Sequence, residues 1–177
     1  PATSVIKEVN GVYGIIDAVA SVNGVGYETF ADALAAANAG DTIKETFDIG
    51  KKIGFDYAGL GYWLNERGEP EDYSDCEVIK YSYKGNGHKF VVGSPLGGED
   101  GDYYLYVMGS EGWKTVYVPW DYLQYECWGL VCGEGTIEGV NGQVTNFTWH
   151  FEKTGSIEIT GLDCVDRKEF LKVEKLE

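Results

Sequence analysis

From residue 43 onward, hydrophobic and polar residues alternate in a series of short stretches, which is the pattern of β-strands with one buried face. In the first clear stretch, Ile79, Tyr81 and Tyr83 alternate with lysine and serine. Further stretches follow after glycine-rich turns, and the predicted strands span 79–84, 89–92, 103–108, 113–120, 144–152 and 156–160. Many short strands with no helices between them predict an all-β fold, an antiparallel β-sandwich.

The N-terminal part contains the one segment that predicts a helix, over residues 29–40. Thr29 suits the N-cap, the glycine at 40 suits the end, and an apolar stripe lies between them, formed by Phe30, Ala33, Leu34 and Ala37. We therefore expect residues 1–42 to form a strand and helix appendage that packs on the sandwich or leads into it. Residues 43–177 would form the sandwich.

The end of the chain alternates again. Phe170 and Lys172 lie on one side of this pattern, and Leu171 and Val173 lie on the other. The alternation predicts a last strand over 168–176 at a sheet edge, where lysine opposes pairing with another chain.

Aromatic residues are concentrated between positions 102 and 129, where two alternating stretches flank a short turn and predict a β-hairpin. Within 113–120 the two faces of the strand are both large, with Val116, Val118 and Trp120 on one side and Trp113, Thr115 and Tyr117 on the other. Both faces need a cover. For the second face this could be another sheet or loop, or a flat ligand such as a sugar chain, and the segment itself favours neither.

Charge narrows the range of partners. The chain has 177 residues, with 14 Lys and Arg against 29 Asp and Glu, so its net charge of −15 would repel phosphate backbones and anionic bilayers. We therefore expect no nucleic acid partner.

No apolar stretch is long enough to span a bilayer, so we also expect no membrane insertion. The start at Pro1 and the closing Leu176-Glu177 indicate a module of a longer protein, expected to be monomeric.

The sequence shows no pattern typical of a cofactor site, a zinc site or a catalytic site. No glycine-rich phosphate motif follows a strand, so no cofactor is expected. The four cysteines lack the spacing of a zinc site, and only Cys127 and Cys132 are close enough in sequence to suggest a local bridge; we expect free or loosely paired thiols, at positions 76, 127, 132 and 164. His88 and His150 have no nucleophile placed beside them by sequence. The acids of the turn at 97–102 are typical of a solvated turn, so no catalytic residues are predicted.

Two segments combine aromatic rings with short polar side chains, which is the chemistry that recognises sugars. Tyr62 and Trp63 lie in a glycine-flanked segment, and the segment 124–128 places Gln124 beside Tyr125 and Trp128. In each segment the rings could instead fold back over the core.

The stretches GWKTVYVPWDYLQYECWG and VTNFTWHFEKTGSIEITGLDCV resemble the closing strands of the β-jelly-roll carbohydrate-binding modules of bacterial cellulases, especially those that hold single β-glucan chains in a cleft. The resemblance covers about residues 78–165. It implies a jelly roll and a set of sugar-binding side chains, namely Tyr62, Trp63, Asp102, Gln124, Tyr125, Trp128 and His150. Gly161-Leu162-Asp163 stands where the family usually ends in an Asp-Asn pair, which puts a structural calcium ion in doubt. The loop after the strand that ends at Pro119, which borders the cleft in the family, has no arginine here.

A second resemblance concerns residues 21–43, which are similar to a recurring strand and helix unit of bacterial cell-surface proteins. Together the two resemblances imply a secreted or cell-surface module without catalytic activity that binds a polysaccharide of the β-glucan type and targets a tethered enzyme to it. The alternative is a structural or adhesive surface module without a glycan cleft. Exposed aromatic side chains gathered on one face would favour binding, whereas a spacer should bury nearly all of them.

Overall fold

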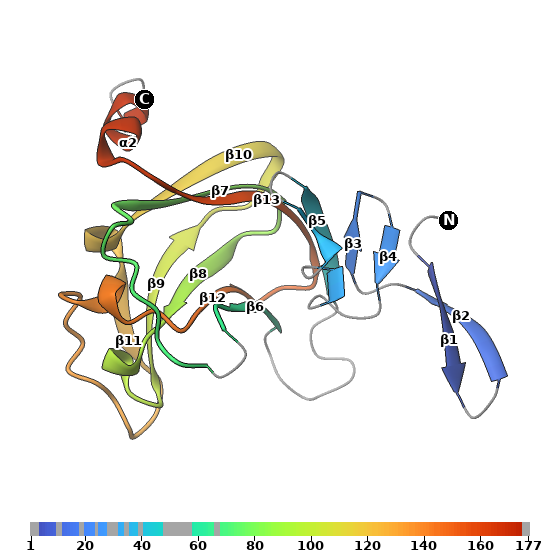
Figure 1. Cartoon of the computed structure of the whole chain (residues 1–177), viewed down its shortest axis with the longest axis horizontal. Coiled ribbons are helices and arrows are strands. Elements are labelled where there is room, and N and C mark those ends of the chain that lie inside the picture. The colour runs from blue at the N-terminus through green and yellow to red at the C-terminus, as the bar shows by residue number, and fades with distance from the viewer. Residues whose placement is uncertain are drawn as a thin grey trace.

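Two antiparallel β-sheets form the body of the protein (Figure 1). The structure is a computed structural model, and it describes residues 4–9, 12–17, 20–23, 25–27, 32–33, 36–38, 41–47, 58–65 and 68–174. The six-stranded sheet has the order β10-β7-β13-β5-β3-β4, and the five-stranded sheet has the order β11-β9-β8-β12-β6. The predicted antiparallel sandwich is confirmed.

The six-stranded sheet consists of β10 (Ser110–Pro119), β7 (Val78–Gly85), β13 (Gly155–Val165), β5 (Thr42–Phe47), β3 (Ala20–Val22) and β4 (Val25–Tyr27). The five-stranded sheet consists of β11 (Gln124–Cys127), β9 (Gly101–Val107), β8 (His88–Gly93), β12 (Asn146–Phe151) and β6 (Ala58–Trp63). Short 3-10 turns lie at Pro95–Gly97, Trp120–Tyr122 and Val140–Gly142.

The core lies between the sheets, and the alternation of the strands fills it. From the six-stranded sheet, β7 contributes Tyr81 and Tyr83, while β8 and β12 of the facing sheet contribute Phe90 and Trp149. The ring of Tyr81 stacks on Phe90 at 5.0 Å and meets Trp149 edge to face at 5.6 Å. Because every second residue of these strands is large and apolar, each sheet has one face that must be buried.

The predicted hairpin at 102–129 is wrong, because its two strands belong to different sheets. β9 pairs with β8 and β11, whereas β10 pairs with β7. The short connection at Met108–Gly109 crosses from one layer to the other, beside the β7–β8 connection, where a Cβ added at Gly109 would lie 3.0 Å from the nitrogen of Gly87. The inner faces of β9, with Tyr103, and of β10, with Val116 and Val118, are therefore covered by the opposite sheet rather than by each other.

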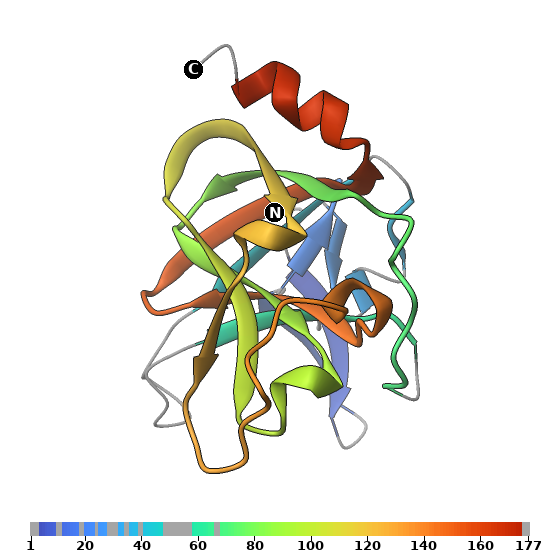
Figure 2. The same cartoon turned by 90° about the vertical axis from the view of Figure 1, so that its left-hand side faces the viewer.

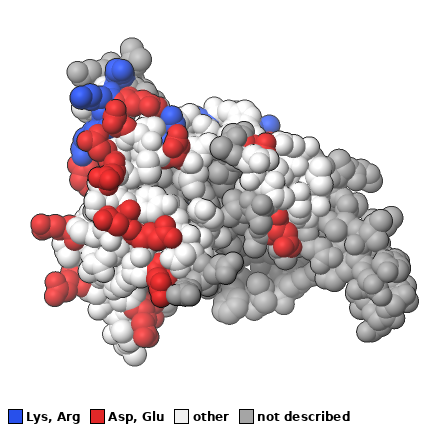
Figure 3. Space-filling model, viewed as in Figure 1, with Lys and Arg blue, Asp and Glu red and all other residues white. Residues whose placement is uncertain are grey.

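The predicted last strand over 168–176 is also wrong, because this segment forms a helix, α2 (Arg167–Glu174). Arginine, lysine, glutamate and leucine favour helices, and over so few residues an alternating pattern does not exclude one. The helix lies above one end of the sandwich (Figure 2), where the ring of Phe170 meets that of Tyr122 edge to face at 5.6 Å and lies 6.1 Å from that of Tyr117. On the face that Figure 3 shows, the basic side chains gather beside this helix.

The N-terminal strands extend the structure on the other side. β3 and β4 continue the six-stranded sheet beyond β5, and β1 (Ser4–Val9) and β2 (Val12–Asp17) form a separate hairpin. Most of the helix predicted over 29–40 lies outside the described residues. Within it the described positions 32, 33 and 36 have helical backbone, and Ala33 is fully buried. The boundary at residue 42 stays a prediction. Across the described ranges, no helix is both long and apolar enough to cross a bilayer.

All four cysteines are paired, which corrects the expectation of free or loosely paired thiols. Cys76 bonds to Cys164 across 88 residues, and Cys127 bonds to Cys132 across five. The long-range pair could not be predicted from spacing, because the two residues meet only once Cys164 on β13 lies opposite β7 and its flank. Two disulfides favour an oxidising compartment.

Candidate functional site

The outer face of the five-stranded sheet combines aromatic and polar side chains. It is the face opposite the core, and it carries the residues that alternate with the buried ones on each strand. We call it the outer face, and its side chains include Trp63, Lys89, Asp102, Tyr104, Tyr106, Gln124, Glu126, Asn146, Thr148 and His150.

The structure brings most of the predicted site residues together on this face. Trp63, Asp102, Gln124 and His150 come from four different strands of the sheet. Trp128 follows β11 at the edge, and its indole nitrogen Nε1 donates a hydrogen bond of 3.1 Å to Oδ2 of Asp102. These five predicted residues, which come from separate parts of the sequence except for Gln124 and Trp128, therefore share one surface.

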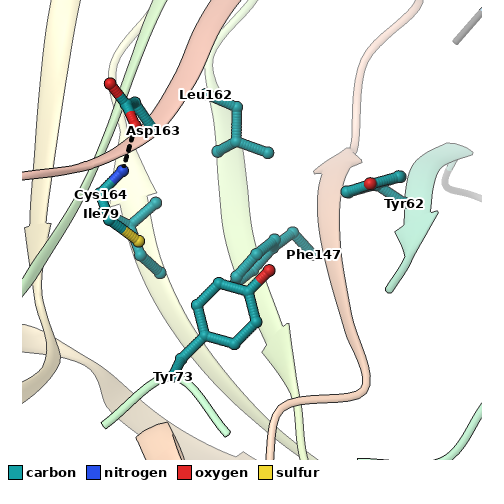
Figure 4. A pocket seen from close by; sticks show the side chains of 7 residues that line it. All are labelled: Tyr62, Tyr73, Ile79, Phe147, Leu162, Asp163 and Cys164. Carbon is teal, nitrogen blue, oxygen red and sulfur yellow. Dashed lines mark hydrogen bonds between the residues drawn. The ribbon is translucent and has the colours of Figure 1, made fainter. Parts of the chain in front are cut away.

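Tyr62 does not belong to the outer face. Its side chain points to the core side of β6, as that of Leu60 does, because alternate residues of a strand share a face. Trp63 points to the opposite face. There it lines a pocket of about 280 Å³ together with Tyr73 and Phe147 (Figure 4).

Tyr125 is the second predicted residue that faces inward. Its ring lies 5.2 Å from that of Tyr103, and its hydroxyl donates to the carbonyl oxygens of Gly97 and Gly133 at 3.1 and 3.3 Å. The side chain thus fastens a loop beside the sheet instead of facing solvent.

A line across the strands of the outer face ends in two exposed tryptophans. Trp63 of β6 pairs in register with Asn146 of β12, and Asn146 pairs with Gly93 of β8. Further along, Asp102 of β9 receives the bond from Trp128. At about 4.8 Å per strand the line is about 19 Å long. Gly93, in the middle of this line, adds no side chain to the surface, and the side chain of Asn146 occupies the place where a Cβ on Gly93 would be.

The loop that carries Trp128 is held at several points. The Cys127–Cys132 disulfide closes it, and the carboxylate of Asp100 accepts the backbone N–H groups of Leu130 and Val131 at 2.7 and 2.8 Å. The backbone nitrogen of Trp128 also donates to the carbonyl oxygen of Asp100 at 2.9 Å. A ring that is 62% exposed is therefore attached to a braced backbone.

Lys89 and Glu126 form an ion pair on the outer face. Nζ of Lys89 lies 2.5 Å from Oε1 of Glu126. Burial and the nearby ammonium of Lys89 lower the pKa of His150, against the opposing effect of the carboxylates Glu152, Asp102 and Glu126. His150 is therefore neutral at neutral pH, a state in which an imidazole can both donate and accept hydrogen bonds.

Sequence reasoning missed several side chains of this face. Tyr104 and Tyr106 follow Asp102 at intervals of two in the same strand, so the alternation that places Asp102 outward also places them there. That signal was available. No comparable signal marks Lys89, because its role depends on Glu126, 37 residues away.

Three of the groups considered for catalysis have structural roles, namely His88, Cys127 and Cys132. His88 is buried, and its Nε2 lies 2.7 Å from the hydroxyl of Tyr81. Cys127 and Cys132 are bonded to each other and cannot serve as thiol nucleophiles in this state. Within the described part of the chain, no group of three or more His, Cys, Asp or Glu residues could hold a metal ion.

Comparison with known proteins gives matches among solved structures alone. No family model matches the sequence, and no curated protein matches it. The family 11 carbohydrate-binding module of the cellulosomal cellulase Lic26A-Cel5E of Clostridium thermocellum is similar with a TM-score of 0.51 at 16% identity, over 71% of this chain and 75% of that one. A family 11 module from Clostridium thermocellum in complex with a β-1,3-1,4-mixed-linked tetrasaccharide gives a TM-score of 0.52 at 15% identity, over the same shares of 71% and 75%.

The likeness shows the fold. The chain has a two-sheet sandwich like that of these two carbohydrate-binding modules, and the resemblance of its closing strands predicted this fold.

Proposed function

We propose that this protein is a carbohydrate-binding module that holds a single β-glucan chain on the outer face of its five-stranded sheet. The observation that carries the proposal is the presence of three exposed aromatic rings on one polar surface. Trp63 and Tyr106 are each 60% exposed, and Trp128 is 62% exposed. Leaving such rings in water gains nothing for folding, so a ligand is the most economical account of them.

The chemistry of the face suits a neutral polyhydroxylated chain. The C–H faces of a sugar ring stack on tryptophan or tyrosine, and its hydroxyls pair with carboxylates, amides and neutral imidazole. Here Asp102, Gln124 and His150 would select the hydroxyl pattern, while Trp63 and Trp128 would stack on rings at the two ends of the line across the strands.

The arrangement favours a soluble single chain over crystalline cellulose. A flat crystal surface would need aromatic rings in one plane, whereas polar side chains separate Trp63 from Trp128 on the outer face. The β-1,3-1,4-mixed-linked tetrasaccharide in complex with the structurally similar family 11 module supports the same class of ligand. We therefore infer a β-1,4-linked or mixed-linkage glucan as the ligand.

The module would act by proximity and without catalysis. Binding at micromolar affinity, roughly −8 kcal/mol, would keep a tethered enzyme close to its polymer by raising the effective concentration. We infer a monomeric module of a longer secreted or cell-surface protein, and the two disulfides support an extracellular location.

Affinity electrophoresis on soluble β-glucan, xyloglucan, mannan and xylan tests the proposal. We expect retardation by at least one β-1,4-linked or mixed-linkage glucan, and little binding to crystalline cellulose. A matched control is Trp113→Ala, because Trp113 is 48% exposed but lies on β10 of the other sheet. No retardation of the folded protein by any of these polymers would contradict the proposal and favour the structural or adhesive alternative.

A further inference from the structure

A cationic side chain, Lys89, lies beside the exposed ring of Tyr106 on the outer face. In register, Lys89 of β8 stands between Tyr106 of β9 and His150 of β12. Its ammonium is turned away from water, because only 12% of the side chain is exposed and Nζ lies 2.5 Å from Oε1 of Glu126 on β11. A lysine on a sheet surface would ordinarily extend into solvent.

The ammonium of Lys89 also lies close to two tyrosine rings. Nζ lies 4.9 Å from the centroid of the Tyr104 ring and 5.3 Å from that of the Tyr106 ring. The two rings meet edge to face at 5.2 Å. Both distances from the ammonium fall within the range of a cation–π interaction, which strengthens when the cation is shielded from water.

The two rings differ in what else holds them. Tyr104 is buried, so packing fixes it, whereas 60% of Tyr106 is exposed. The ring of Tyr106 also contacts Lys89 and Tyr104. An aromatic platform that is already fixed before the ligand arrives loses less side-chain entropy on binding, which improves affinity without any new contact.

We propose that Lys89 is a positioning residue of the glycan-binding face: anchored by Glu126, its ammonium holds the ring of Tyr106 in place as a stacking platform. This inference rests on the proposed function. It assigns Lys89 no contact with the sugar, and it adds Tyr106 to the residues that touch the ligand.

The charge of Lys89 is maintained in this position. Burial acts to lower the pKa of its ammonium, but the hydrogen bonds to Glu126 and Tyr106 and the electrostatic attraction of the same two groups together raise the pKa above its usual value. The cation is therefore present over the whole range in which the protein would bind a glycan.

A double-mutant cycle tests whether Lys89 acts through Tyr106. The variants are Lys89→Met, Tyr106→Leu and the two combined, with glucan affinity measured by calorimetry. We expect Lys89→Met to bind roughly tenfold more weakly. The combined variant should bind no more weakly than Tyr106→Leu, because Lys89 has no ring left to hold. Glu126→Gln, which removes the anchor without changing β8, should also weaken binding.

The titration of His150 by NMR gives a readout that does not need the ligand. The charged groups that face His150 are Lys89 of β8, Asp102 of β9, Glu126 of β11 and Glu152 beyond β12, while β6 places Gly59 opposite it. Removing a positive neighbour should raise the pKa of His150, and removing a negative one should lower it. Lys89→Met and Glu126→Gln should therefore shift this pKa in opposite directions although both weaken binding.

The outcomes separate this inference from the proposed function. Wild-type affinity in Lys89→Met, or additive losses in the combined variant, would overturn the role of Lys89 and leave glucan binding intact. Failure of the wild-type protein to bind any soluble glucan would overturn both.

Discussion

At the scale of single residues, exposure separates tryptophans that pack from tryptophans that are available to a ligand. Trp149 is 2% exposed and contacts Phe90 and Tyr81 in the core, whereas Trp128 is 62% exposed. The indole of Trp128 is held by Asp102, which faces the proposed ligand. A change at each position should therefore affect a different property of the protein.

We predict that Trp128→Ala loses about 1–3 kcal/mol of glucan binding free energy and changes the stability by less than about 1 kcal/mol. Trp149→Ala should instead cost about 3–5 kcal/mol of folding free energy by leaving a core cavity. Calorimetric affinity and melting temperature, measured for both variants beside Trp113→Ala, check this. If Trp128→Ala unfolds like Trp149→Ala, the loop is part of the core and our assignment of its ring is wrong.

Buried His88 should make the stability depend on pH. Burial lowers its pKa from 6.5 to about 4, against the hydrogen bond to the carbonyl oxygen of Asn86, which raises it. As the pH falls below 6.5, the unfolded chain takes up a proton at His88 and the folded protein does not, so the free energy of unfolding falls. The loss should reach about 2 kcal/mol at about pH 5 and be complete below the folded pKa.

Denaturant unfolding between about pH 7.5 and pH 5, above the usual range of Asp and Glu titration, measures this loss. In His88→Gln the loss should largely disappear, since glutamine can still bond to the hydroxyl of Tyr81 but does not titrate. The matched control is His150→Gln on the outer face, which should keep most of the loss. An unchanged pH dependence in His88→Gln would contradict the assignment.

The alternation of residues along a strand decides which of the predicted site residues face the ligand. Adjacent residues of a strand point to opposite faces, so Trp63 and Tyr62 cannot both face a ligand, and neither can Gln124 and Tyr125. All four were candidates for sugar binding because aromatic and polar residues stand side by side in these two segments. The structure leaves Trp63 and Gln124 on the outer face.

At the scale of elements, the two disulfides have different roles. The Cys76–Cys164 bond joins residues 88 apart and restricts the unfolded chain strongly. The Cys127–Cys132 bond spans only five residues, and the loop that it closes contains Trp128. The first should matter for folding and the second for binding.

Replacing Cys76 and Cys164 with alanine should cost about 2–5 kcal/mol of stability. Replacing Cys127 and Cys132 with serine should lower the melting temperature much less, because little loop entropy is released, and should weaken glucan binding several-fold by loosening Trp128. Melting curves and affinities of the two double variants make the comparison. Unchanged glucan affinity without the short bridge would show that Asp100 alone keeps the loop in place.

Elements with long, regular alternation were predictable, and those defined by their neighbours were not. β7, β8 and β12 could be predicted from their own residues. A strand with one apolar face is stable in a sandwich only when that face points to the core. The separation of β9 from β10 depends on which sheet each strand joins. Likewise, the position of α2 beside the sandwich involves the contact of Phe170 with Tyr122, which joins two segments far apart in the sequence.

At the scale of the whole molecule, the jelly-roll order of the strands assembles the site. The strands that carry it appear in the sheet in the order β11-β9-β8-β12-β6, so neighbours in space are seldom neighbours in sequence. Trp63 and Trp128 consequently belong to one surface although 65 positions separate them. Each site residue could be proposed from its type, but their common face depends on this topology.

The central claim is that a glucan chain binds the outer face of the five-stranded sheet. The chain has five tryptophans, and each should give an indole N–H signal in NMR. Nε1 of Trp120 donates a hydrogen bond to the carbonyl oxygen of Cys76, and Trp149 is buried in the core. The signals of these two residues therefore serve as internal controls. Trp113 reports on β10 in the other sheet.

Titration of the wild-type protein with a soluble mixed-linkage β-glucan oligosaccharide therefore tests the claim most directly. We predict that the signals of Trp63 and Trp128 shift together with a single affinity, while those of Trp113, Trp120 and Trp149 stay in place. A shift of Trp113 without Trp63 and Trp128, or no shift of any signal at saturating oligosaccharide, would contradict it.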